Sequence, residues 1–134
     1  RSLRYWPDNT MVLNNYAYFL SLEGRDLERA LAMAGRAIVL EENNPTYLDT
    51  YAWVLYRLGR YDEAKKTMQQ ALSLDRSQSP DLQLHYGDIL AALGEKFMAE
   101  VYWKKALEGG YDDPDAIVER FRRLKEAAQT PAAP

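Results

Sequence analysis

Three glycines at equal spacing constrain this chain more than any other feature of its sequence. Gly24, Gly59 and Gly94 stand 35 residues apart. Each separates two stretches with helical periodicity, and glycine ends helices readily because it adopts a left-handed backbone at little cost. The spacing predicts a chain built from helix pairs of one size, each with a tight turn at its glycine.

Small residues recur with the same period at places where two helices would touch. One set lies in the first helix of each pair, and two sets lie in the second helix. The sets are Ala17, Ala52 and Gly87, then Ala30, Ala64 and Ala99, then Ala37, Ala71 and Ala106, with spacings of 34 or 35 residues. A long side chain at these places would hold the helices apart, so the pattern predicts closely packed backbones.

The stretch from 45 to 75 shows one complete unit. Asn44 can cap a helix, and Pro45 suits its first position, where no amide donor is needed. The helix that follows carries an apolar stripe, and a second helix at 61–74 carries another. The two stripes are Leu48, Tyr51, Ala52, Leu55 and Leu58, and then Ala64, Met68, Ala71 and Leu72.

A period near 34, two helices per period and small residues at fixed offsets resemble the tetratricopeptide repeat. The resemblance covers about residues 1–112. It implies an all-α fold, a right-handed α-solenoid of three helix pairs, followed here by a C-terminal capping helix. The predicted divisions are a remnant of a preceding repeat with its link at 1–9, repeat units at 10–44, 45–79 and 80–112, a capping helix at 113–128, and a disordered tail at 129–134.

The two ends of the chain differ from the repeats. Arg1–Trp6 resembles the last turns of a second helix, so we expect a longer parent protein, with an irregular arm as the alternative. At the other end, Ile117, Phe121 and Leu124 form a narrow apolar stripe suited to capping the last unit. The opposite face is charged, and we expect it to face solvent. Its residues are Glu119, Arg120, Arg122, Arg123, Lys125 and Glu126.

Charge and composition argue against several classes of function. The 134 residues include 20 acidic and 17 basic side chains, a net charge of −3, which argues against nucleic acid or an anionic membrane surface as partner. The chain has no cysteine and therefore no disulfide. No apolar run approaches the roughly 20 residues of a membrane span, so we expect no direct membrane insertion by this segment.

The sequence offers little to catalysis, and we expect a protein that is not an enzyme and that uses no cofactor or metal. It has one histidine, no cysteine and no glycine-rich phosphate loop. Asp81, His85 and Asp88 recur at i, i+4 and i+7, so they share one helical face. A site for a divalent metal is one interpretation of these residues, and a polar surface stripe is the interpretation that we favour.

The first helices of tetratricopeptide repeats line a concave wall, so the resemblance implies a groove for a partner. The candidates are the residues opposite the packed stripes. They are Asn14, Asn15, Tyr18, Asp49, Thr50, Trp53, Tyr56, Arg57, Asp81, Leu84, His85 and Asp88. Aromatic side chains are enriched at interfaces, which favours binding, and the competing interpretation is that Trp53 packs between neighbouring first helices.

We therefore expect a non-catalytic scaffold that binds a peptide or helix segment of another protein. Acids at Asp49, Asp81 and Asp88 predict a neutral-to-basic segment, and Trp53 predicts an apolar anchor on it. Asp81 and His85 stand where relatives that bind acidic chaperone tails carry basic residues, so that mode is disfavoured. The alternative function is a purely structural repeat segment that supports another part of the parent protein and has an empty groove.

Two stretches also resemble the C-terminal repeat region of bacterial cell-envelope tetratricopeptide proteins. They are LDTYAWVLYRLGRYDEA and HYGDILAALGEKFMAEVYWKKAL. This resemblance favours the cell envelope or periplasm over the cytoplasm, with the targeting signal on a part of the parent protein that precedes this segment.

Overall fold

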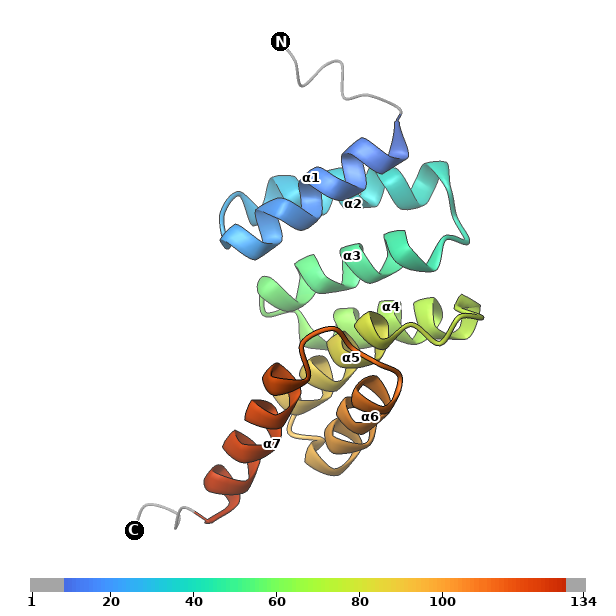
Figure 1. The fold of residues 1–134 in the computed structure, drawn as a ribbon. Helices are drawn as coiled ribbons and strands as arrows, with labels where there is room; N and C mark the ends of the chain where they lie inside the picture. Colours follow the sequence, from blue (N-terminus) through green and yellow to red (C-terminus); the bar gives the residue numbers. More distant parts are fainter. Residues whose placement is uncertain (1–8, 130–134) are drawn as a thin grey trace. The chain divides into compact units, whose positions relative to one another are not determined.

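The computed structural model describes residues 9–129, and the regular structure within that range is α-helical (Figure 1). The helices follow one another with short turns between them. They are α1 (Thr10–Glu23), α2 (Leu27–Leu40), α3 (Pro45–Arg57), α4 (Tyr61–Leu74), α5 (Pro80–Ala92), α6 (Lys96–Glu108) and α7 (Pro114–Gln129). The predicted all-α fold class is confirmed.

The chain divides into two compact units, Arg1–Ser77 and Gln78–Pro134. In the N-terminal unit α1 packs on α2, α2 on α3 and α3 on α4, whereas in the C-terminal unit α5 packs on α6 and α6 on α7. The predicted helix pairs are therefore α1–α2, α3–α4 and α5–α6. None of the helices formed by residues 9–129 has the length and apolar character that crossing a membrane requires.

The predictions for the two ends of the chain fall largely outside the described residues. The predicted repeat remnant at 1–9 lies outside them except for Asn9, and the predicted tail lies outside them from residue 130 onward. Gln129 belongs to α7, so the helix runs one residue further than the sequence predicted.

Short-range interactions set the helix ends. The Asn9 side chain accepts a hydrogen bond from the Val12 amide at 3.2 Å, and Asn44 Oδ1 accepts hydrogen bonds from two amides at 3.0 and 3.2 Å. The turns inside the pairs lie at the three periodic glycines, whose φ angles of 70, 82 and 84° are left-handed. This left-handed conformation is the one that the sequence predicted for these glycines.

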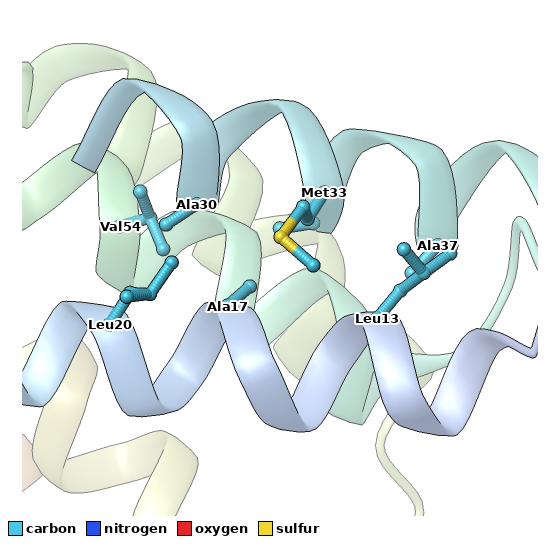
Figure 2. Packing of buried hydrophobic residues seen from close by; sticks show 8 residues of the cluster. Leu13, Ala17, Leu20, Ala30, Met33, Ala37 and Val54 are labelled. Carbon is cyan, nitrogen blue, oxygen red and sulfur yellow. The ribbon is translucent and has the colours of Figure 1, made fainter. Parts of the chain in front are cut away.

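The core of the N-terminal unit is apolar (Figure 2). Leu13, Ala17 and Leu20 of α1 point toward Ala30, Met33 and Ala37 of α2, and Val54 of α3 joins them. The three periodic alanines in this set have no exposed surface, which confirms the close backbone packing predicted from them.

Helix α3 covers the first pair through its aromatic residues. Tyr47, Tyr51 and Leu58 are half-buried against this core. A Cβ atom placed on Gly35 of α2 would lie 3.5 Å from Tyr51 Cε1, an ordinary van der Waals distance, so the tyrosine ring lies beside α2 at a small residue. Repeat units in this half of the chain are thus joined by aromatic rings against a small residue.

The core of the C-terminal unit is built around one tryptophan. Trp103 of α6 is 4% exposed and lies over Gly87 of α5. A Cβ atom on Gly87 would lie 2.4 Å from Trp103 Cδ1, closer than carbon atoms approach, so this position has room for glycine alone unless the ring moves. Phe121 of α7 meets the ring edge-on, with centroids 5.8 Å apart.

Candidate functional site

The N-terminal unit presents the predicted site residues on two neighbouring helices. Helices α1 and α3 run in the same direction and contact each other (Figure 1). Because they belong to successive repeats, their side chains correspond at intervals of 35 residues, so Asn14 matches Asp49 and Tyr18 matches Trp53. We call this surface the α1–α3 face and define it as Asn14, Asn15, Tyr18, Asp49, Thr50, Trp53, Tyr56 and Arg57.

The members of the α1–α3 face differ widely in how deeply they are buried. Asn15 and Arg57 are exposed, and Tyr18 and Tyr56 are half-buried. The other four members are at least nine-tenths buried, at 3–9% exposure, and they are Asn14, Asp49, Thr50 and Trp53. The accessible part of the face therefore consists of two tyrosine rings, one amide and one guanidinium group.

An aromatic stack dominates the α3 side of this face. The Trp53 and Tyr56 rings are stacked, with centroids 4.6 Å apart and planes 20° apart. Tyr61, the first residue of α4, contacts Tyr56 at a centroid distance of 5.5 Å, with its ring plane tilted by 49°. Sequence reasoning did not include Tyr61, and the signal for it was an aromatic residue directly after the Gly59 turn.

Two polar groups on the face differ in how the fold satisfies them. The Thr50 hydroxyl donates to the Thr46 carbonyl oxygen of its own helix at 3.3 Å. Asn14 Oδ1 is buried and has no hydrogen-bond partner among the described residues. A buried carbonyl oxygen without a donor costs about 1–3 kcal/mol, so Asn14 is a locally destabilising group on this face.

The C-terminal unit holds the remaining candidates on α5, which we call the α5 face. Asp81 is exposed, whereas Leu84, His85 and Asp88 are 2, 9 and 8% exposed. Burial raises the pKa of Tyr111, and the Asp81 carboxylate raises it further. The interpretation of Asp81, His85 and Asp88 as a polar surface stripe is wrong, because two of the three side chains are buried.

Asp88 is committed to contacts inside its own unit. Its Oδ1 accepts from Arg120 Nε at 2.7 Å and from Trp103 Nε1 at 2.9 Å, and its Oδ2 accepts from Arg120 Nη2 at 2.9 Å. This two-pronged ion pair joins α7 to α5, and the tryptophan joins α6 to both. The expectation that Arg120 lies on a solvent-facing side of α7 is wrong, since its side chain turns inward to Asp88.

The metal interpretation finds no arrangement to support it in the described part of the chain. Residues 9–129 contain no group of three or more histidine, cysteine or acidic side chains placed to hold a metal ion. Asp88 has both carboxylate oxygens engaged by Arg120, which leaves Asp81 and His85 as the other members of that candidate set.

Two hollows lie elsewhere on the molecule. One of about 420 Å³ lies between α6 and α7 and is lined by Lys96, Glu100, Phe121, Leu124 and Lys125. Another of about 350 Å³ lies along the turn that joins α2 to α3, at residues 41–46. Neither of these two hollows includes a member of the α1–α3 face.

Helix pairs of one length, joined by the same turn and packed through the same small residues, define a helical-repeat protein. Residues 45–77 match the family described as Tetratricopeptide repeat. A TPR repeat-containing protein of Pseudomonas aeruginosa is 30% identical over 82 residues, which are 61% of this chain and 14% of that protein. Residues 45–77 thus match a tetratricopeptide repeat, and the chain spans a small part of the length of this relative.

Solved structures agree on the fold. The Yersinia enterocolitica type III secretion translocator chaperone SycD has a TM-score of 0.75 at 18% identity, over 92% of this chain and 97% of that one. The first TPR of Spaghetti (RPAP3), bound to the HSP90 peptide SRMEEVD, has a TM-score of 0.76 at 18% identity, over 90% and 94%. At these identities the likeness is one of fold alone. Tetratricopeptide repeats are in general non-enzymatic modules for protein interaction.

Proposed function

We propose that this chain is a non-catalytic scaffold whose α1–α3 face binds a peptide or helix segment of a partner protein. The observation that carries the proposal is the Trp53–Tyr56–Tyr61 aromatic cluster, in which the half-buried Tyr56 ring stacks on Trp53 and contacts Tyr61. Rigid aromatic rings bury much area at little entropic cost, which makes them effective anchors. Asn15 and Tyr18, on the neighbouring helix, supply an exposed amide and a second ring.

The bound segment is proposed to be neutral to basic and to carry an aromatic or aliphatic anchor. Asp49 is the acid of the α1–α3 face, at 7% exposure, and Arg57 is its exposed base, so burial of the anchor rather than charge should supply most of the affinity. The relative bound to SRMEEVD holds an acidic peptide, and the bases which that mode needs are replaced here by Asp81 and His85.

A purely structural role remains the second candidate, and the burial of Trp53 favours it. At 9% exposure this ring contributes to the packing of its own unit. Trp53→Ala would cost about 3–5 kcal/mol of stability by leaving a cavity, so it does not separate binding from folding. Tyr56 and Tyr18 are the better probes because they are partly accessible.

The test selects a phage-displayed library of random peptides on the 134-residue chain and measures the best peptide by fluorescence anisotropy. We expect peptides with an apolar anchor and no net negative charge, and Tyr56→Ala should weaken binding at least about tenfold. Phe97→Ala is the matched control, since Phe97 is an exposed aromatic residue on α6, outside both candidate faces. Acidic peptides, or peptides that tolerate both Tyr56→Ala and Tyr18→Ala, would contradict the proposal.

A further inference from the structure

The hollow between α6 and α7 lies within the C-terminal unit, and no member of the α1–α3 face or the α5 face lines it. Its walls are Lys96 and Glu100 of α6 and Phe121, Leu124 and Lys125 of α7. Its volume of about 420 Å³ falls in the range of roughly 300–1,000 Å³ that sites for small molecules occupy. We call it the α6–α7 hollow.

A mismatch between two helical stripes leaves this space open. Trp103 of α6 meets Phe121 of α7, with ring centroids 5.8 Å apart. Glu100 and Lys96 stand three and seven residues before Trp103, so they share its face of α6. The apolar stripe of α7 continues to Leu124, where α6 supplies charged side chains instead of an apolar one. The hollow therefore occupies the place of an apolar group that α6 lacks.

The apolar wall of the hollow is held in place before any ligand arrives. Phe121 is half-buried and meets the buried Trp103 ring edge-on, at an interplanar angle of 80°. The residue before it, Arg120, is fixed by its ion pair with Asp88 of α5. A wall that needs no rearrangement on binding costs a ligand little affinity.

The charged groups of the hollow favour one negative charge. Lys96 and Lys125 are exposed, so their aliphatic stems line the hollow while their ammonium groups reach solvent at its edge. Neither lysine forms an ion pair with another of the described residues. Two lysines and the single Glu100 carboxylate give the lining a net charge of +1, which matches a ligand with one anionic group.

We propose that the α6–α7 hollow binds a medium-chain alkyl carboxylate, that is, a fatty acid. Its chain lies against Phe121 and Leu124, and its carboxylate pairs with Lys96 and Lys125. The alkyl chain supplies the apolar contact that α6 lacks, and the single carboxylate balances the charge of the lining. This site is separate from the α1–α3 face and does not depend on the role proposed for that face.

A polypeptide segment is a poorer occupant of the same hollow. The lining contains three charged side chains and no amide or hydroxyl group, and the backbone groups of α6 and α7 are used within their own helices. Peptide amides carried into the hollow would lose water without gaining hydrogen-bond partners. A fatty acid has polar atoms at one end alone, where the lysines can meet them.

The test titrates decanoate, below the concentration at which it forms micelles, into the isotope-labelled 134-residue chain at neutral pH and low salt. Amide NMR shifts report where it binds. We expect saturable shifts in residues 96–100 and 121–125. Hexanoate, with a shorter chain, should bind at least about tenfold more weakly, because fewer methylene groups are buried. Decylammonium, with the same chain length and the opposite charge, should also bind at least about tenfold more weakly than decanoate.

Variants of exposed side chains make the result specific to the hollow. Lys96→Gln and Lys125→Gln should each weaken decanoate binding about three- to fivefold, and together about tenfold, as expected for exposed charge pairs. Glu100→Gln should strengthen it about two- to threefold by removing a like charge. Lys104→Gln is the matched control, since Lys104 is an exposed lysine of α6 that does not line the hollow. Circular dichroism checks that each variant folds.

Three results would overturn the proposal. The first is the absence of saturable decanoate shifts in the two stretches of residues around the hollow. The second is equal decanoate affinity in the parent chain and the double lysine variant. The third is tighter binding of acetyl-Ala-Leu than of decanoate at these residues, which would make the occupant the carboxyl terminus of a polypeptide.

Discussion

The N-terminal and C-terminal units use the same repeat pattern but complete it in different ways. The N-terminal unit packs an apolar cluster around Leu13, Leu20 and Met33, and it leaves Val12 and Phe19 of α1 exposed. In the C-terminal unit the carboxylate of Asp88 is buried and forms an ion pair with Arg120 of α7. The same repeat pattern therefore allows apolar packing in one unit and a buried ion pair, Asp88–Arg120, in the other.

Apolar burial and a buried ion pair differ in how strongly they specify which helix packs where. An apolar stripe gains free energy from burial against any complementary helix, so it specifies its partner weakly. A buried ion pair gains little net stability, but it penalises any arrangement that leaves one charge without the other. Asp88 and Arg120 thus fix the placement of α7, whereas the apolar cluster of the N-terminal unit specifies its helix contacts through shape.

The largest expected effect comes from breaking the Asp88–Arg120 ion pair. Asp88→Ala should lower the stability of the C-terminal unit by about 3 kcal/mol, because Arg120 and the buried Trp103 Nε1 both lose their acceptor. Urea unfolding followed by tryptophan fluorescence measures the loss, and amide exchange should speed up in α7 while α1 and α2 stay unchanged. Asp88→Leu combined with Arg120→Met is the matched variant that removes both charges, and it should recover most of the loss. Unchanged amide exchange in α7 would show that the ion pair does not hold this helix in place.

A smaller effect tests the small-residue positions of the two units against each other. Gly87→Ala should gain about 1 kcal/mol of helix propensity and lose more than that by displacing Trp103, for a net loss of about 1–2 kcal/mol. The corresponding residue in the N-terminal unit is already alanine, Ala52, with no exposed surface. Thermal midpoints of the variant and the parent chain decide the sign. A stabilised Gly87→Ala variant would mean that the Trp103 ring moves aside freely.

The smallest effect concerns the exposed charges of α7 and α4. Hydrogen bonds from Arg122 and Arg123 lower the pKa of Glu119 to about 2, and Arg60 lowers the pKa of Glu63 in α4. Both folded-state pKa values lie below the ordinary value of 4.5, so their stabilisation is present above that pH and is lost as the pH falls toward the folded pKa. A carboxyl titration by NMR should give Glu119 the lower midpoint of the two, and Arg123→Gln should raise it. Equal midpoints for both glutamates would contradict the contribution of a second arginine.

Much of the fold was predictable because its signals are local. The period of the glycines, the caps at Asn9 and Asn44 and the left-handed turns each depend on backbone geometry within a few residues. Periodicity also assigned the residues of the α1–α3 face to one side of their helices, but it did not predict that four of the eight would be buried. Its proposed role in binding stays a prediction.

What the tertiary structure alone decided was the environment of each side chain on those faces. By sequence, Arg120 belongs to a run of charges with Glu119 and Arg122, and Asp88 resembles any acid on a polar stripe. Only the packing of α7 brings these two together, with Asp88 buried and Arg120 half-buried. The same holds for Trp53, which packing buries, and for Tyr56, which it leaves accessible. Sequence periodicity determines direction around a helix axis, but burial depends on which helix lies opposite and at what distance.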